Sequence, residues 1–326
     1  MKFIGLFIGI IISSVGFAQK SKVIDLEQEW KFTIGDREEY SSTNYDDSSW
    51  ESIYVPAKWE DQGFLNYNGY AWYRISFDGS ELEEYKNLLL SLGYIDDVNE
   101  TYFNGEKIGF KGSFPPDYYT AYDAYNEYQI PDRLINREGK NTIAVKVYDL
   151  TLGGGICGGE IAIYFEPKMP NDFFSLEGVW KFSTTRKRNW EEKYYNDEDW
   201  DDIVVPSFWR SKHIRNSNGL GWYRTEFVLP ENLKDKDLYL VLGQIDDFDY
   251  TYINGEIVGR TKDNLSFGLS TSYNEFRIYK ISKEKLNQTG SNVIAVQVED
   301  IGGEAGIYDG PVGLATKILS KNSFKD

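Results

Sequence analysis

The sequence predicts an all-β protein built from two tandem antiparallel β-sandwich domains. Three observations support this fold class: an internal duplication, many short aliphatic runs, and the absence of long helical periodicity. Landmarks of the first half return 150 positions later. Because this period far exceeds the units of solenoid proteins, each copy is expected to be a domain with its own core. The recurring pairs include Trp30 and Trp180, Trp50 and Trp200, Pro56 and Pro206, Trp72 and Trp222, Asp96-Asp97 and Asp246-Asp247, and Asn104-Gly105 and Asn254-Gly255.

The first 18 residues have the pattern of a secretory signal peptide. Lys2 precedes an apolar run over residues 3–12, and small residues follow up to Ala18. The run is shorter than the ~20 residues that span a bilayer, so the protein is expected to be periplasmic or secreted and not membrane-embedded. The predicted division is a signal peptide at 1–18, a first β-sandwich module at 19–169 and a second at 170–326.

Within each copy, the strands and turns can be placed in order. Aliphatic or β-branched runs bounded by turn residues are typical of sandwich strands. The Asn-Gly pairs at 104–105 and 254–255 supply the two positive φ angles of a tight hairpin turn. The clearest helix candidate is the short stretch 282–286, and prolines mark a linker at 166–171. The strand runs are residues 88–92, 142–147, 238–242 and 293–298.

Composition narrows the classes of partner. The formal net charge of -17 argues against nucleic acid or an anionic membrane, because such binding depends on cations that pair with phosphates. Aromatic residues make up 16% of the chain. Many are expected in the cores, Trp30, Trp72, Trp180 and Trp222 among them, and the remainder can form a surface that stacks on a flat ligand. The one cysteine, Cys157, leaves no intramolecular disulfide possible.

An ordered series of short motifs carries a resemblance to a known family. In the second copy these are Gly178-x-Trp180, Val205-Pro206-Ser207-Phe208-Trp209, Gly221-Trp222-Tyr223-Arg224, Ile245-Asp246-Asp247, Tyr252-x-Asn254-Gly255 and Gly306-Ile307. Together they resemble the sugar-binding, galactose-binding-like jelly-roll domain at the N-terminus of family 2 glycoside hydrolases, such as β-galactosidases and β-glucuronidases. In that family the catalytic carboxylates belong to a separate barrel domain, for which two modules and a leader leave no room. The resemblance therefore implies the architecture without the glycosidase activity.

The resemblance also implies which loops approach a sugar. They are residues 59–71 and 149–155 in the first copy, and residues 209–221 and 300–306 in the second. Exposed aromatic rings offer sugars a flat apolar face, although the same rings could instead seal a sandwich edge. The ligand-binding candidates are Trp59, Tyr67, Tyr70, Asp149, Trp209, Lys212, Asp300 and Glu304.

A cationic loop follows Trp209 in this acidic chain. It contains Arg210, Lys212, the only histidine, His213, and Arg215. One interpretation is recognition of a uronate or sulfate, and the other is a solvated loop that balances nearby acids. As a catalytic group, His213 could abstract a proton beside a uronate, with Arg210 or Arg215 stabilising the anion. An incidental role for this histidine is the alternative.

No metal or cofactor is required by the sequence. The aspartate pairs at 96–97 and 246–247 recur at one structural place, which favours a role in the fold. The acids clustered over residues 300–309 could hold a structural calcium, but they lack the spacing of a known calcium loop.

Three functions remain open at this stage. The favoured one is a secreted carbohydrate-binding protein of a polysaccharide-degradation system, with acidic (uronate or sulfated) glycans as one option. The second is a glycan-active enzyme, a uronate-directed lyase or dehydratase or else a hydrolase, with its site around His213. The third is a non-catalytic partner of a glycoside hydrolase. Enzymatic activity is left undecided, with a binding role preferred.

Overall fold

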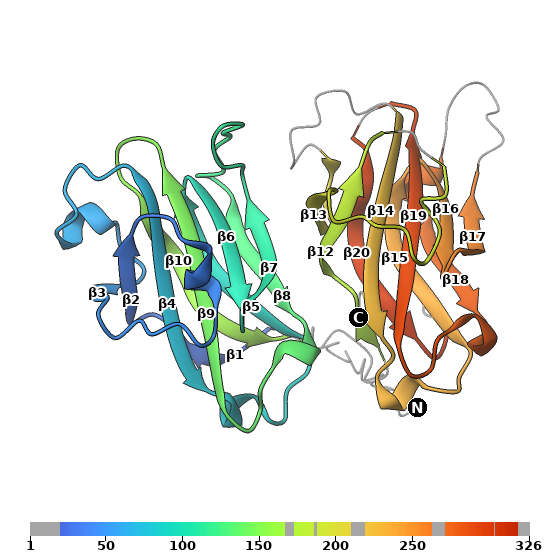
Figure 1. Ribbon diagram of the computed structural model, residues 1–326, viewed down its shortest axis with the longest axis horizontal. Helices are drawn as coiled ribbons and strands as arrows, with labels where there is room; N and C mark the ends of the chain where they lie inside the picture. Colours follow the sequence, from blue (N-terminus) through green and yellow to red (C-terminus); the bar gives the residue numbers. More distant parts are fainter. Residues whose placement is uncertain are drawn as a thin grey trace, which may run out of the picture.

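The computed structural model describes residues 20–166, 173–185, 188–209, 219–262, 271–302 and 304–318. Figure 1 shows two β-sandwiches side by side, and each combines a four-stranded sheet with a six-stranded sheet. We call residues 20–166 module one and residues 173–318 module two. The predicted fold class is confirmed, and no α-helix occurs in the described parts of the chain. Within these parts, no helix is long and apolar enough to cross a membrane.

Module one contains ten antiparallel strands. Its sheets have the orders β1-β10-β5-β8 and β3-β2-β4-β9-β6-β7. Short 3-10 turns lie at Glu38–Ser41, Trp59–Gln62 (η2), Gly79–Leu82 and Asp132–Leu134. The strands are β1 (Ser21–Asp25), β2 (Glu29–Ile34), β3 (Glu51–Tyr54), β4 (Gly69–Asp78), β5 (Leu88–Asp96), β6 (Val98–Phe103), β7 (Glu106–Lys111), β8 (Tyr125–Ile130), β9 (Lys140–Asp149) and β10 (Gly155–Phe165).

Module two repeats this topology, with the orders β11-β20-β15-β18 and β13-β12-β14-β19-β16-β17. The 3-10 turns described here are Glu231–Leu233, Ser272–Asn274 and Lys283–Lys285, so the helix expected at 282–286 is a single turn. The strands are β11 (Phe174–Ser175), β12 (Gly178–Ser183), β13 (Asp201–Val205), β14 (Gly219–Val228), β15 (Leu238–Asp246), β16 (Phe248–Ile253), β17 (Glu256–Thr261), β18 (Phe276–Ile281), β19 (Ser291–Asp300) and β20 (Gly306–Ala315).

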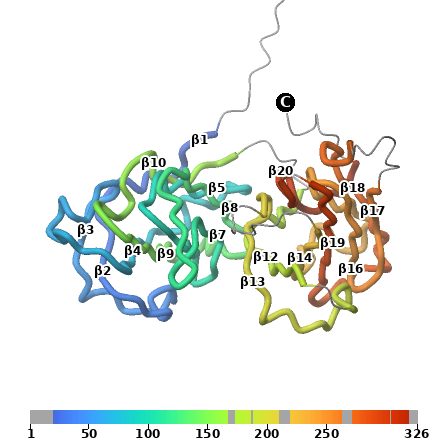
Figure 2. The backbone as a smooth tube through the Cα atoms, turned by 90° about the horizontal axis from the view of Figure 1, so that it is seen from above, coloured from blue at the N-terminus to red at the C-terminus, as the bar shows by residue number. Residues whose placement is uncertain are grey.

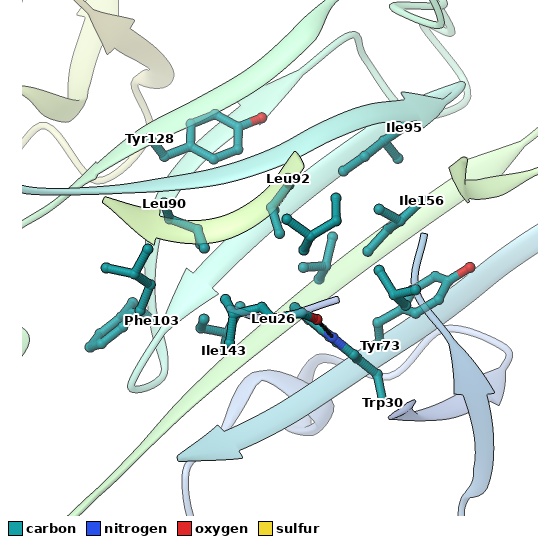
Figure 3. Packing of buried hydrophobic residues seen from close by; sticks show 14 of the residues in the cluster. Leu26, Trp30, Tyr73, Leu90, Leu92, Ile95, Phe103, Tyr128, Ile143 and Ile156 are labelled. Carbon is teal, nitrogen blue, oxygen red and sulfur yellow. Dashed lines mark hydrogen bonds between the residues drawn. The ribbon is translucent and has the colours of Figure 1, made fainter. Parts of the chain in front are cut away.

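Each sandwich encloses one main hydrophobic core. Figure 3 shows that of module one, where aliphatic side chains of both sheets surround Trp30 and Tyr73. The indole nitrogen of Trp30 donates to the carbonyl of Leu26 at 2.9 Å, and Trp180 repeats this bond to Leu176 at 2.8 Å. Burying a large apolar side chain contributes about 1.5–3 kcal/mol. The buried positions predicted for four tryptophans are confirmed: Trp30, Trp72, Trp180 and Trp222.

Two other repeated motifs serve the fold. Asn104 and Gly105 have φ angles of 49° and 85°, and their counterparts in module two have 51° and 88°, as the predicted hairpin turn requires. The arginine of the Trp-Tyr-Arg motif is buried in both modules. Arg74 donates to Asp47 at 2.8 Å, and Arg224 donates to Asp197 at 2.6 Å. These arginines anchor the loop before β3 or β13, which explains why the motif recurs.

Candidate functional site

In module one the two loops expected to approach a ligand lie against each other, and in module two the described ends of the equivalent loops are in contact. In module one the amide of Trp59 donates to the carbonyl of Gly154 at 3.2 Å, and the Gly154 amide returns a bond to the carboxylate of Glu60 at 3.2 Å. In module two the amide of Trp209 donates to the carbonyl of Ala305 at 2.8 Å. The described parts of the predicted loops therefore share one end of each sandwich.

The two tryptophans in these loops do not face solvent. Trp59 is 0% exposed and Trp209 is 1% exposed. The indole nitrogen of Trp59 donates to Glu60 at 2.6 Å, and that of Trp209 donates to the hydroxyl of Tyr223 at 2.5 Å. Each indole finds its hydrogen bond inside the protein and fills the core beneath the loop. A role of these two residues in ligand binding stays a prediction.

The tyrosines proposed beside Trp59 have different surroundings. Tyr67 donates to the carbonyl of Tyr70 at 2.7 Å and packs its ring against Trp59 at 5.8 Å, so it seals the core. Tyr70 stacks on Phe114 with ring centroids 5.6 Å apart, and the ammonium of Lys146 lies 4.9 Å from its ring. Tyr70 thus belongs to a half-buried aromatic stack on the six-stranded sheet.

The cationic candidates Arg210, Lys212, His213 and Arg215 lie outside the described residues. Of the remaining candidates, Glu304 is half-buried just before β20, while Asp149 and Asp300 are buried. The two aspartates lead to a grouping that the sequence did not reveal.

Three aspartates of module one meet at the loop end of the sandwich. Asp96 ends β5, Asp97 connects β5 to β6, and Asp149 ends β9. Each offers a carboxylate oxygen, and these oxygens all lie within 4.8 Å of one another. We call this set the module-one trio. Asp96 is half-buried, whereas Asp97 and Asp149 are 7% and 0% exposed, so solvent reaches the trio at Asp96.

Hydrogen bonds fix the two buried members of the trio. Asp97 accepts from the hydroxyl of Thr120 at 2.5 Å and from the amide of Leu150 at 3.0 Å. Asp149 accepts from the amide of Thr151 at 3.3 Å. The fold role predicted for the aspartate pair is therefore confirmed for Asp97, which ties the β9–β10 loop to the sheet. Asp96 has a different environment.

Burial, neighbouring charges and hydrogen bonds shift the pKa values of the three carboxyl groups in different directions. Burial, together with the neighbouring Asp97, raises the pKa of Asp96 to about 7. Burial and the charge of Asp97 also raise the pKa of Asp149 to about 7. Burial opposes the ionised form of Asp97 as well, but hydrogen bonds from Thr120 and Leu150 outweigh it and leave the pKa of Asp97 lowered. Near neutral pH the trio therefore holds one fixed charge and two carboxyls close to their midpoint.

Module two repeats the arrangement with Asp246, Asp247 and Asp300, the module-two trio, whose carboxylate oxygens also lie within 4.8 Å of one another. Asp247 accepts from the amide of Ile301 at 3.1 Å. Burial and Asp247 raise the pKa of Asp246 to about 7, and burial raises the pKa of Asp300. Among the described residues, one carboxylate oxygen of Asp300 is buried without a hydrogen-bond partner. In both modules the peptide bond between the paired aspartates is cis.

Each trio offers acceptors suited to two kinds of ligand. A hard divalent cation would find three of the six to eight oxygen ligands that calcium takes. Sugar hydroxyls would find carboxyl groups that form charge-assisted hydrogen bonds. The repeated aspartates are visible in the sequence, but their grouping depends on the pairing of β6 with β9. This pairing places Val98 opposite Tyr148, so the start of β6 lies beside the end of β9.

Exposed aromatic residues occur close in the chain to members of the module-one trio or to Thr120, which bonds Asp97. Tyr122, which is 59% exposed, donates its amide to the same Thr120 hydroxyl that bonds Asp97. Tyr94 and Tyr125 meet edge to face with centroids 5.2 Å apart, two residues or fewer from the ends of β5 and β8. The acidic end of module one therefore carries apolar faces beside its carboxyl groups.

Comparison with known proteins identifies relatives that carry the names beta-glucuronidase and beta-galactosidase. Residues 187–304 match the model of the beta-galactosidase second all-beta domain. A putative beta-glucuronidase of Formosa agariphila is 29% identical over 152 residues, which cover 42% of this chain and 14% of that protein. A beta-galactosidase of Priestia megaterium is 27% identical over 153 residues, which cover 38% of this chain and 14% of that protein. The matched region is thus a small part of each relative.

Solved structures show the same kind of neighbour at low similarity. A Bacteroides uniformis beta-glucuronidase aligns at a TM-score of 0.37 and 16% identity, covering 88% of this chain and 28% of that one. A beta-glucuronidase from glycoside hydrolase family 2 aligns at 0.39 and 13% identity, covering 88% of this chain and 27% of that one. The matched domain model and the two relatives above confirm the resemblance predicted from the motifs: the chain is similar to all-β domains of β-glucuronidases and β-galactosidases.

Proposed function

We propose that this protein binds carbohydrate at the loop end of its modules, through Asp96 in module one and Asp246 in module two. The observation that carries the proposal is the repeated trio, in which one half-buried carboxyl is presented at the surface and two buried ones support it. Similarity to domains of glycan-hydrolysing enzymes supports the choice of ligand class.

The chemistry of the presented carboxyl suits a polyhydroxyl ligand. Because the pKa of Asp96 and of Asp246 is about 7, each group is available near neutral pH both as a hydrogen-bond acceptor and as a donor. Vicinal sugar hydroxyls also act in both ways. The exposed rings of Tyr94 and Tyr122 provide apolar surface for the carbon face of a pyranose.

The cellular setting follows from the same proposal. A signal peptide at residues 1–18 would direct the protein to the periplasm or the medium, where it would bind oligo- or polysaccharide within a degradation system. Uronate or sulfated glycans would in addition engage Arg210, Lys212 and Arg215. A glycoside hydrolase is the partner that this setting favours.

Titration of the full mature chain with oligosaccharides tests the proposal. Calorimetry would compare neutral hexasaccharides with uronic acid hexasaccharides on the wild type, Asp96→Asn, Asp246→Asn and the double variant. A charge-assisted hydrogen bond contributes about 1.5–3 kcal/mol, so each single substitution should weaken its site by roughly 10-fold or more. Asp235→Asn, which removes the same charge from an exposed turn with a φ of 55°, is the matched control.

Three outcomes separate the candidate functions. Binding of the uronic acid hexasaccharide that survives unchanged in the double variant would reject the trios as the binding groups. Shortened or dehydrated products detected by mass spectrometry, and lost in His213→Ala, would establish the eliminative enzyme instead. Co-purification with a glycoside hydrolase, without glycan binding, would favour the non-catalytic partner.

A further inference from the structure

A cleft separates the two modules where their six-stranded sheets approach each other. Figures 1 and 2 both show β7 of module one beside β12 and β13 of module two. The cleft has a volume of about 360 Å³ and takes its walls from both modules. Ligand pockets commonly have volumes of ~300–1,000 Å³ and occur preferentially at domain interfaces. It is distinct from both aspartate trios, whose residues do not line it.

A connected set of charged groups spans the cleft. The ammonium of Lys107 lies 2.7 Å from Glu100 and 3.0 Å from Asp202, so it links module one to module two. The other oxygen of Asp202 accepts from Lys181 at 3.1 Å. These contacts place donors and acceptors at fixed positions and neutralise both lysines. With Asp201 also in the wall, the lining carries more acids than bases, which disfavours an anionic ligand.

Aromatic side chains from both modules supply the apolar part of the wall. Phe114 is held by its stack on Tyr70 and by the ammonium of Lys146, 4.7 Å from its ring. Phe110 lies 5.9 Å from the ammonium of Lys107. On the opposite side, Trp200 packs against another tryptophan at 4.5 Å and stays half-buried. Aromatic faces beside fixed polar groups are the combination that pyranose rings bind.

The internal repeat shows that the sandwich does not require Lys107, Phe110 or Asp202. Positions 150 residues apart occupy the same place in the two modules, so a residue needed for the fold should recur. Lys181 and Trp200 do recur, as Lys31 and Trp50, but several other lining residues have counterparts of a different chemical class. Lys107 corresponds to Ile257, Phe110 corresponds to Arg260, and Asp202 corresponds to Ser52.

We propose that the cleft between the modules binds a pyranose residue of a neutral glycan. Lys107, Lys181 and Asp202 would exchange hydrogen bonds with its hydroxyls, while Phe110 and Trp200 would pack against its carbon faces. The site goes beyond the proposed function, because it is separate from the trios and selects uncharged sugars. Since its walls come from both modules, a bound glycan also stabilises one orientation of the pair.

The repeat provides substitutions that the fold already accepts. Phe110→Arg and Asp202→Ser each install the residue found at the equivalent position, and the reciprocal Arg260→Phe is the matched control. The probes are β-linked hexasaccharides of glucose, xylose, mannose and galactose, titrated calorimetrically into the full mature chain. At least one probe should bind, and both cleft variants should weaken it at least 10-fold. Arg260→Phe and the double variant Asp96→Asn with Asp246→Asn should leave this binding unchanged.

Contrary results would be equally clear. Binding that persists in both cleft variants but is lost in the double aspartate variant would reject the cleft and leave the proposed function standing. Absence of binding by any neutral probe would reject the cleft, and absence of binding by uronate probes as well would reject both. If a variant fails to fold, hydrogen exchange of the wild type decides: the bound probe should protect β7 and β13, and unchanged exchange there would overturn the proposal.

Discussion

The two modules place different polar groups at one equivalent point between their sheets. In module one the amide of Asn99 donates to Asn126 at 2.8 Å, and the hydroxyl of Tyr128 donates to Asn99 at 2.9 Å. In module two the corresponding pair is ionic: Arg277 lies 3.2 Å from Asp249, with side chains 1% and 0% exposed. The same backbone therefore accommodates a neutral pair in one copy and a buried ion pair in the other.

The difference also affects the candidate sites, because Arg277 contacts a member of the module-two trio. Its guanidinium donates to the backbone carbonyl of Asp247 at 2.5 Å, and its positive charge opposes the rise in the pKa of Asp246. Module one has Asn126 at this place, whose amide donates to the carbonyl of Gly93 at 3.0 Å and carries no charge. Both modules thus have an acidic trio, but the neighbouring buried side chain is a charged arginine in module two and a neutral asparagine in module one.

The largest expected effect is the loss of stability when Arg277 or Asn126 is replaced by alanine. Arg277→Ala should destabilise module two by about 3–5 kcal/mol, because it leaves the buried carboxylate of Asp249 without its partner. Asn126→Ala should cost module one only about 1–3 kcal/mol, the cost of unsatisfied neutral groups. Urea denaturation followed by hydrogen exchange, which assigns each transition to its module, measures both values. Equal losses would mean that the ion pair and the amide pair are energetically equivalent.

A double substitution sharpens the comparison. Asp249→Asn combined with Arg277→Asn converts the pair of module two into that of module one, so no unpaired charge stays in the core. We expect this variant to regain about 1–2 kcal/mol of the stability lost in Arg277→Asn alone, within the usual range of coupling for residues in contact. The double-mutant cycle in urea gives the coupling energy directly. A coupling energy near zero would contradict the assignment of the loss to an unpaired charge.

The smallest effect concerns pH. The pKa of Asp149 is about 7 in the folded protein, above its ordinary value of 3.8, so between these values the folded state binds more protons than the unfolded state. Its contribution to stability is complete below pH 3.8 and is lost as the pH rises through 7. Asp149→Asn should therefore flatten the decline of module-one stability between pH 5 and 8 by roughly 1 kcal/mol per pH unit. Thermal melts across this range, with Asp235→Asn as control, would show it, and an unchanged slope would exclude Asp149 as the source.

The duplication and local turn chemistry predicted much of the fold. Asn104-Gly105 indicated its hairpin because the required φ angles are a local property of those residue types. The trios were not predicted as sites, because Asp97 and Asp149 come together only through the order of strands in the sheet. Trp59 was assigned to a ligand surface because a loop sequence does not show which way an indole points. The binding role itself stays a prediction for both modules.

The contact between Lys107 and Asp202 also limits how modules can assemble. It joins the β7 edge of one copy to β13 of the next, a head-to-tail arrangement that in a repeat could continue without closing. The exposed β17 edge presents Ile257 where β7 presents Lys107, and module one presents Ser52 where module two presents Asp202. Since neither residue is charged, the ion pair that joins the two modules has no equivalent between the outer edges of two molecules.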